Sequence, residues 1–218
     1  MSEIETYREN SPSYFEIFSK ILDELSWRKV ASFEAIEKDE HLRILNLINL
    51  TNSQVLNSWV WDFQIEKASI EVKKDNEKVL ENFCGKIINI YDGIKKYRYI
   101  HPTLFSKTNR SEIYTTLGDK VLVKPVNFDR KLDIIYIDGH QGRNAQGDKI
   151  AKLTNKNDTS IIPVPFCEPI LVYGTLIKIK ANPSFAKFGF WRAMYYDSIA
   201  LLRSSTVVNN PAQINLCN

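Results

Sequence analysis

The chain has 218 residues, which is enough for one large domain or two small ones. Hydrophobic residues make up 44% and charged residues 25%, with 8 Gly and 8 Pro, and this balance excludes disordered, collagen-like and low-complexity proteins. The formal net charge of +3 is too small to indicate nucleic-acid binding by itself. It divides unevenly, however, because residues 1–109 carry −2 and residues 110–218 carry +5.

The cysteines and the N-terminus indicate the compartment. Cys84, Cys167 and Cys217 are scattered without Cys-x-x-Cys spacing, which fits neither a disulfide framework nor a zinc site. Residues 1–7 are acidic and polar, unlike a signal peptide. No apolar run approaches the roughly 18 residues that a membrane span requires. We expect a cytoplasmic protein without a membrane partner.

The first predicted element is a helix over residues 12–26, where apolar side chains recur at intervals of three and four. Ser13 and Glu16 have the spacing of a capping box at its start. Val30–Ile36 and Leu42–Leu50 are predicted as two strands joined by a short charged connection. The second has apolar residues at both parities, which is typical of a strand buried on both faces.

A hairpin is predicted next. Residues 59–65 and 69–73 alternate between apolar and polar side chains, and a turn at Lys67 and Ala68 pairs the two runs. The polar side chains that this register gathers on one face are Asp62, Gln64, Glu71 and Lys73. A long helix is predicted to follow over residues 75–96, where apolar residues return to helical spacing.

The remainder of the chain has shorter β-branched runs and more turn residues, a pattern typical of an antiparallel barrel or sandwich. Its predicted strands are Lys120–Val126, Leu132–Asp138, Lys149–Leu153, Ile161–Val164, Ile170–Lys180 and Ala193–Arg203. The turn residues Gly118-Asp119 precede the first of them. The sequence therefore predicts an α+β fold. An N-terminal helix–strands–helix region spans 1–109, an antiparallel β region spans 110–203, and a flexible tail spans 204–218.

Three residues of the predicted hairpin have the chemistry of a metal-dependent nuclease. Two carboxylates, Asp62 and Glu71, suit Mg²⁺, and Lys73 beside them suits charge stabilisation or water orientation. An Asp, a gap and then Glu-x-Lys before a helix resembles the catalytic core of the restriction-endonuclease-like nucleases. That resemblance covers residues 12–96 and implies Asp62 and Glu71 as metal ligands and Lys73 as the assisting base. The simpler interpretation is a solvated sheet face with an Asp62–Lys73 ion pair.

Two further sites carry polar groups at strand ends. Asp138 and His140 fit a metal site or an acid–base pair, although Asp-Gly at this place is more often a turn. Gly142–Lys149 resembles a phosphate-binding loop but has Asp148 where a lysine is needed. It is interpreted as a loop whose Arg143 contacts an anion.

Aromatic and cationic residues alternate near the C-terminus. The residues concerned are Lys178, Lys180, Phe185, Lys187, Phe188, Phe190, Trp191 and Arg192. Nucleic-acid bases stack on aromatic rings while Lys and Arg neutralise phosphates, so this composition fits a single-stranded nucleic-acid platform. Packing in a core or in a protein interface accounts for the same residues.

These patterns predict a non-catalytic binding protein, a subunit of a nucleic-acid-handling complex. It contacts nucleic acid or another protein chain through the basic and aromatic C-terminal region, and it needs no cofactor. One alternative is a Mg²⁺-dependent nuclease at Asp62, Glu71 and Lys73. The other is an adaptor or inhibitor that binds only protein.

Overall fold

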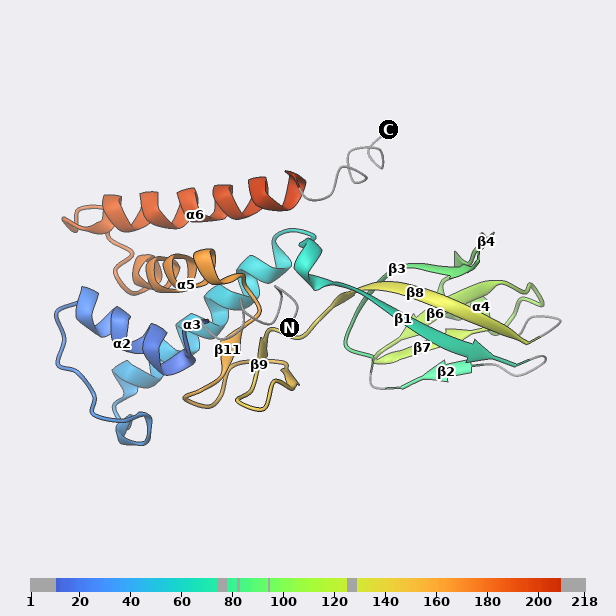
Figure 1. The fold of residues 1–218 in the computed structure, drawn as a ribbon, viewed down its shortest axis with the longest axis horizontal. Helices are drawn as coiled ribbons and strands as arrows, with labels where there is room; N and C mark the ends of the chain where they lie inside the picture. The colour runs from blue at the N-terminus through green and yellow to red at the C-terminus, as the bar shows by residue number, and fades with distance from the viewer. Residues whose placement is uncertain (1–10, 74–77, 82, 94, 125–128, 209–218) are drawn as a thin grey trace, which may run out of the picture. The chain divides into compact units, whose positions relative to one another are not determined.

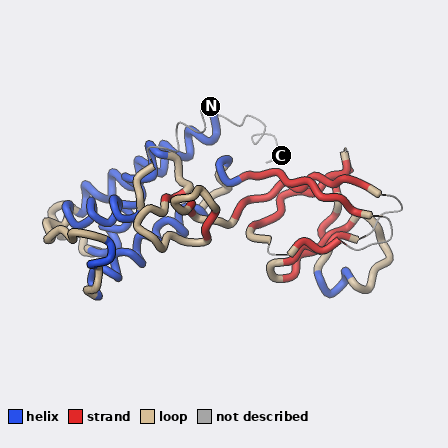
Figure 2. The backbone as a smooth tube through the Cα atoms, turned by 60° about the horizontal axis from the view of Figure 1, so that its bottom comes forward, coloured by secondary structure: helices blue, strands red, loops and turns tan. Residues whose placement is uncertain are grey.

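Helices and open β-sheets are both present, so the fold class is α+β, as predicted. The computed structural model describes residues 11–73, 78–81, 83–93, 95–124 and 129–208 (Figure 1). Two units can be separated: unit 1 comprises Met1–Phe63 and His140–Asn218, and unit 2 comprises Gln64–Gly139. Most strands belong to unit 2 and most helices to unit 1 (Figure 2). Among the described residues, no helix is both long and apolar enough to cross a membrane.

This division differs from the predicted boundary near residue 109. Unit 2 is inserted into unit 1, because strand β8 (Arg130–Asp138) returns to pair antiparallel with β1 (Ile65–Val72). The pairing runs from Ile65 opposite Ile137 to Val72 opposite Arg130. Contacts between residues about 65 positions apart therefore define unit 2, and composition along the chain does not reveal them.

Helices form the core of unit 1. They are α2 (Tyr14–Glu24), α3 (Asp39–Asn57), α5 (Val164–Ile179) and α6 (Phe188–Val208), with a 3₁₀ turn η1 (Phe33–Ala35) between α2 and α3. Helix α5 packs against α2, α3 and α6, and Figure 1 shows α5 and α6 side by side. The buried residues of α5 accordingly lie on several of its sides: Cys167, Ile170, Leu171, Val172, Gly174, Thr175 and Leu176.

Three predicted strands of unit 1 are wrong, since Leu42–Leu50 lies in α3, Ile170–Lys180 largely in α5 and Ala193–Arg203 in α6. In α5 the cause is burial on several sides, which removes the one-sided apolar pattern that distinguishes a helix. In α3 the buried residues do follow helical spacing, but three of them are polar. The buried residues are His41, Ile44, Leu45, Ile48, Thr51, Asn52, Val55 and Leu56. Val30–Ile36 contains only the turn η1.

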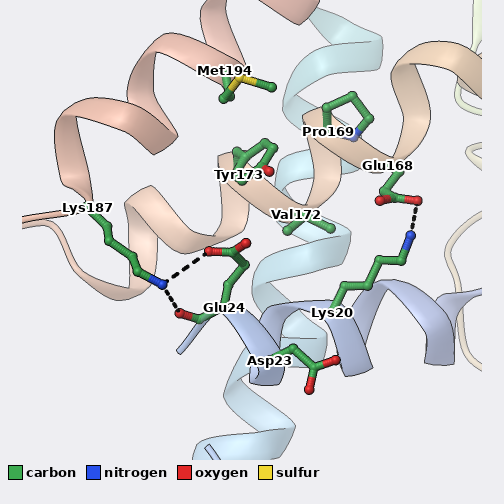
Figure 3. Close-up of a pocket in the computed structure, with 9 residues that line it drawn as sticks. All are labelled: Lys20, Asp23, Glu24, Glu168, Pro169, Val172, Tyr173, Lys187 and Met194. Atoms are coloured by element: carbon green, nitrogen blue, oxygen red, sulfur yellow. Dashed lines mark hydrogen bonds and ion pairs between the residues drawn. The ribbon is translucent and has the colours of Figure 1, made fainter. Parts of the chain in front are cut away.

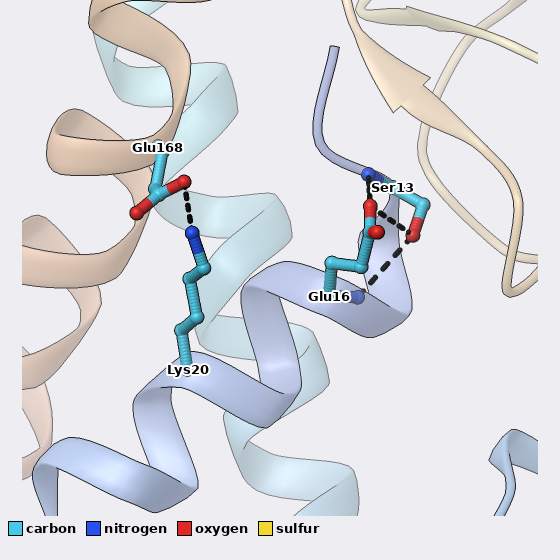
Figure 4. Close-up of polar contacts among 4 residues, drawn as sticks. All are labelled: Ser13, Glu16, Lys20 and Glu168. Atoms are coloured by element: carbon cyan, nitrogen blue, oxygen red, sulfur yellow. Dashed lines mark hydrogen bonds and ion pairs between the residues drawn. The ribbon is translucent and has the colours of Figure 1, made fainter. Parts of the chain in front are cut away.

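The predicted N-terminal helix is confirmed as α2, together with its capping box (Figure 4). The Ser13 side chain accepts from the Glu16 backbone N–H at 3.3 Å, and Glu16 Oε2 accepts from the Ser13 N–H at 2.7 Å. Both interactions satisfy backbone donors that the first helical turn leaves unpaired. An ion pair between Lys20 and Glu168 then joins α2 to α5.

Replacing Ser13 with Ala is expected to lower the free energy of unfolding by about 1 kcal/mol, because the cap is lost and no buried side chain changes. Urea denaturation followed by circular dichroism measures this change. Ser13→Asp, which keeps a capping oxygen, is the matched control and should remain close to wild type. Equal losses in both variants would contradict the capping role.

A small three-stranded sheet completes unit 1, in the order β10 (Lys149–Ile150), β9 (Gly142–Arg143), β11 (Thr159–Ser160). Asn52 of α3 binds it from inside. Asn52 Nδ2 donates to the Gln141 carbonyl at 3.0 Å, and Asn52 Oδ1 accepts from the Ser160 hydroxyl at 2.7 Å. The sheet is therefore fixed to the helices by a buried amide. The predicted strand Lys149–Leu153 is present only as the two residues of β10. The predicted strand Ile161–Val164 is wrong, because β11 ends at Ser160 and α5 begins at Val164.

Unit 2 contains two open four-stranded sheets, in the orders β1-β8-β3-β4 and β2-β7-β6-β5. The strands not yet given are β2 (Lys78–Leu80), β3 (Gly85–Asp92), β4 (Lys95–Lys96), β5 (Arg98–Tyr99), β6 (Ile113–Leu117) and β7 (Lys120–Val123). One short helix, α4 (Pro102–Phe105), precedes β6. Neither sheet closes into the predicted barrel, although both contribute to one buried cluster that includes Val72, Ile90, Val121 and Leu132.

Two more predictions fail in unit 2, while three hold. The hairpin of residues 59–73 is a single strand, β1, preceded by the 3₁₀ turn η2 (Asp62–Gln64). The predicted helix over 75–96 is replaced by strands, and Gly85 and Gly93 have the positive φ values, 156° and 60°, that a helix does not allow. The turn at Gly118-Asp119, the strand over 132–138 and residues 120–123 of the strand over 120–126 are confirmed. Residues 75–77, 82, 94, 125–126 and 209–218 of these predictions lie outside the described residues.

The division into units also changes the meaning of the charge asymmetry. Unit 1 has 15 Lys and Arg against 15 Asp and Glu, whereas unit 2 has 14 against 11. The net charge of +3 thus belongs to unit 2. The +5 of the C-terminal half lies in residues 140–218, and within unit 1 it is balanced by −5 on residues 1–63.

Candidate functional site

The residues of the predicted nuclease site are spread along η2 and β1. Asp62 lies in η2, where its Oδ1 accepts from the Phe63 N–H at 2.8 Å. Glu71 is exposed near the far end of β1 and lies opposite Lys131, and Lys73 is exposed just beyond the strand. The hairpin that brought these residues together does not form, which removes the geometric argument for a shared metal. Among the described residues no group of three or more His, Cys, Asp or Glu is arranged to hold a metal ion.

Asp138 and the 142–149 loop make hydrogen bonds within the chain. Asp138 is buried at the end of β8, and its carbonyl accepts from Gln64 Nε2 at 3.3 Å. The loop is closed by its own side chains: Asn144 Oδ1 accepts from the Asp148 N–H at 2.8 Å, and Arg143 Nη1 donates to the Gly147 carbonyl at 3.0 Å. His140, half-buried, is the first residue of unit 1 after the insertion.

The aromatic residues of the predicted C-terminal platform are largely used in packing. Trp191 is fully buried, and its Nε1 donates to Glu24 Oε2 at 3.2 Å. Phe185 packs on Trp191 with ring centroids 5.2 Å apart. Phe188 is half-buried at the start of α6, whereas Phe190 is 53% exposed. A base therefore has no access to Trp191.

Three of the four cations of the same platform have intramolecular partners. Lys187 Nζ lies 3.6 Å from Glu24 Oε2, and Lys178 Nζ donates to the Gly174 carbonyl at 3.2 Å. Burial lowers the pKa of Lys178. Lys180 is half-buried at the end of α5, and Arg192 lies over a tyrosine ring of α6. The platform is thus part of the helical packing of unit 1.

A groove of about 430 Å³ lies among α2, α5 and the start of α6 (Figure 3). Its lining residues are Lys20, Asp23, Glu24, Glu168, Pro169, Val172, Tyr173, Lys187 and Met194. Figure 3 shows the lysines directed at carboxylates, Lys20 at Glu168 and Lys187 at Glu24. The third carboxylate, Asp23, pairs with Lys29, so every charge of the groove has a partner and the field for an ionic substrate is weak.

A more distinctive surface lies in unit 2. Residues 95–111 contain five Lys and Arg and no Asp or Glu. They begin in β4 and continue through β5 and α4 toward β6. Strands β5 and β6 are parallel, with Arg98 opposite Ile113, so the chain entering β5 runs beside the chain entering β6. The ion pair of Lys95 Nζ with Glu112 Oε2, at 2.5 Å, agrees with this arrangement.

Six Lys and Arg residues lie in the segments that lead into β5 and β6 or contact them. We call them the cationic cluster: Lys95, Lys96, Arg98, Lys107, Arg110 and Lys124. Lys124 belongs to it because its backbone N–H donates to the Ile113 carbonyl, its Nζ donates to the Thr108 carbonyl and it lies over the Phe105 ring. Lys96, Arg98, Lys107 and Arg110 are exposed and have no ion pair with any residue that the structure describes. Their charge is therefore available to an external anion.

Two tyrosines accompany the cationic cluster. Tyr99 is 48% exposed and is held edge-on to Tyr114, with ring centroids 5.6 Å apart. Tyr97 is buried, and burial with the nearby Glu112 carboxylate raises its pKa to about 12. Tyr97 stays neutral and anchors the segment between β4 and β5, while Tyr99 presents an aromatic surface beside the cations.

No known protein family matches the sequence, and no curated protein resembles it closely enough to be a relative. The function is therefore inferred from the residues of this chain. A run of 17 residues with five cations and no acid was visible in the sequence. The run was not recognised as a site because its first residues lay in a predicted helix and the others in a predicted connection. Summing the charge over each half of the chain also combined most of it with the acidic N-terminal segment.

Proposed function

We propose that the protein is a non-catalytic binding subunit that contacts the phosphate backbone of a nucleic acid through the cationic cluster of unit 2. The observation that carries this proposal is the grouping of Lys96, Arg98, Lys107 and Arg110, exposed and without ion pairs among the described residues. The site moves from the C-terminal region that the sequence favoured to the unit that holds the net positive charge.

The chemistry of this surface suits a single strand better than a duplex. Lysine and arginine side chains neutralise phosphates and release counterions, and this gives affinity without sequence preference. A half-exposed tyrosine adds stacking on an unpaired base, worth about 1–3 kcal/mol. Arg98 and Tyr99 are both exposed on the edge strand β5, one on each face, so a nucleic-acid strand that follows this edge can contact both.

The test is fluorescence anisotropy with labelled single-stranded and duplex oligonucleotides over a salt series. The double variant Lys96→Ala/Arg98→Ala is expected to bind more weakly and to lower the slope of log K against log salt concentration by about 1–2, because two phosphate contacts are lost. Tyr99→Ala should weaken single-strand binding about tenfold and leave the salt slope unchanged.

The matched control is Lys86→Ala/Lys131→Ala, which removes two exposed lysines of β3 and β8 that lie outside the cationic cluster. It should bind like wild type. Equal weakening in both double variants would show that only overall charge matters, and binding that does not depend on salt would contradict a backbone contact.

A protein-only adaptor is the second candidate, and α6 favours it. Phe190, Tyr196 and Leu201 are 53%, 57% and 59% exposed on this helix. Exposed large apolar side chains of this kind are enriched at protein interfaces. A wild-type protein that binds no oligonucleotide at any salt concentration would favour this function over the first.

We also propose that the two sheets of unit 2 pack as a sandwich. Residues of both sheets share one buried cluster: Val72, Ile90, Leu132 and Ile134 from the first sheet, and Tyr114, Val121 and Val123 from the second. Apolar side chains interdigitating between two open sheets are typical of this architecture.

A reducing compartment such as the cytoplasm is proposed from Cys167. It is a free thiol and is fully buried. Burial raises the pKa of the Cys167 thiol to about 12, so it stays protonated and inert.

A further inference from the structure

Strand β1 (Ile65–Val72) forms an open edge of its sheet. It pairs with β8 on one side, and no other described strand pairs with it. The remaining edge strands of unit 2 are short: β4 and β5 have two residues and β2 has three, whereas β1 has eight. A long edge leaves a row of backbone N–H and C=O groups for another strand.

Exposure alternates along this edge. Lys67, Ser69 and Glu71 are exposed on one face, while Ile70 packs against the core and Val72 is buried on the other. A strand added to the edge must keep apolar residues on the core face, so residues of the same parity must lie opposite one another. For two copies of β1 paired antiparallel, the centre of symmetry then falls on a residue and not between two residues.

Charge selects one of these registers. Centred on Lys67 or on Glu71, the pair places that residue opposite its own copy, and centred on Ile70 it places Lys67 opposite Lys73. Centred on Ala68, it pairs no charges on the exposed face. Centred on Ser69, it places Lys67 opposite Glu71 and Glu71 opposite Lys67, which are two favourable cross-strand pairs.

We propose that β1 pairs antiparallel with β1 of a second copy of this chain, centred on Ser69. The result is a two-fold symmetric dimer with a continuous sheet of two four-stranded halves. A second copy is the occupant because its β1 matches this edge in length, in face alternation and in charge. The inference is independent of nucleic-acid binding, since the cationic cluster lies on other strands.

The two charged residues remain available for this pairing. Glu71 has no ion pair with any described residue. Lys67 Nζ lies 2.8 Å from Asp133 Oδ2, but its side chain is 62% exposed and has room for a second carboxylate. The Ser69 hydroxyl donates to Asp133 Oδ1 at 2.6 Å, and this bond joins the centre of β1 to β8.

Charge reversal tests the register. Sedimentation equilibrium of the wild-type protein is expected to show a monomer–dimer equilibrium. Lys67→Glu and Glu71→Lys each convert two attractive pairs into two repulsive ones and should raise the dissociation constant at least about tenfold. The double variant Lys67→Glu/Glu71→Lys restores both pairs and should dimerise like wild type. Lys86→Glu, on β3 of the same sheet, is the matched control and should leave the constant unchanged.

Cross-linking gives a second measurement. Ser69→Cys should form an intermolecular disulfide under mild oxidation, because the two residues at the centre lie about 4.5–5.5 Å apart between Cα atoms. Lys73→Cys should not exceed the wild-type background of its own thiols. A monomeric wild type, single reversals without effect, or a double variant that fails to recover would overturn the proposal. If the wild-type protein is monomeric, an extended segment of another protein becomes the candidate partner of this edge.

Discussion

Replacing Trp191 with Ala is expected to lower the free energy of unfolding by about 3–5 kcal/mol, the cost of removing a large buried aromatic side chain. Trp191 is fully buried and joins α6 to α2 through its bond to Glu24. Its ring also supports Phe185 in the connection before α6. The variant therefore loses apolar burial, a hydrogen bond and the packing of that connection. Urea denaturation followed by far-ultraviolet circular dichroism measures the change.

The neighbouring residue provides the control. Arg192 is exposed, and Arg192→Ala should change the free energy of unfolding by no more than about 0.5 kcal/mol. Trp191→Phe keeps most of the apolar volume and should fall between Ala and wild type. If Trp191→Ala were as stable as wild type but bound nucleic acid poorly, Trp191 would be a surface contact after all, as its sequence context suggested.

The second large effect is expected at Asn52, a fully buried polar residue of α3. Asn52→Ala leaves the Gln141 carbonyl and the Ser160 hydroxyl without their partner, at a cost of about 1–3 kcal/mol for each group. The loss should detach the β9–β11 sheet before the helices unfold, because Asn52 joins the two. Hydrogen exchange of the sheet amides, together with urea denaturation, measures both consequences.

A double-mutant cycle tests whether Asn52 acts through this network. Ser160→Ala removes one partner, and combined with Asn52→Ala it should cost less than the sum of the two single changes. Asn57→Ala is the matched control, since Asn57 is exposed on the same helix and bonds only locally to Ser53. Additive effects at positions 52 and 160 would contradict the network.

The elements that sequence predicted correctly depend on contacts between near neighbours. Ser13 and Glu16 cap α2 across three residues, and Gly118-Asp119 forms the turn between β6 and β7 with Gly118 at φ 60°. Such signals are local, because the residues that make the structure lie side by side in the chain. The strand over 132–138 was also evident, since its β-branched residues lie between turn residues.

Other predictions failed where one pattern fits two structures. The apolar run of α5 resembles a strand because burial on several sides removes helical spacing. Helix α3 was predicted as a strand because the exposed Leu42 and Leu50 add apolar residues outside its buried face and obscure the helical spacing. Trp61 and Phe63 alternate as a strand does, yet Trp61 is fully buried in unit 1 and donates to the Val55 carbonyl. In each case the structure depends on which side chains are buried, and the local pattern does not reveal this.

By itself the sequence determined the α+β class, the capped first helix, and the residue types from which a binding surface can be built. Only the tertiary structure decided where that surface lies. Pairing of β1 with β8 makes residues 64–139 a unit of their own, which assigns the net charge of +3 to it. The same folding buries Trp191 and leaves Arg98 exposed. The physical reason is that exposure and charge environment depend on residues brought together from distant parts of the chain, which no local pattern encodes.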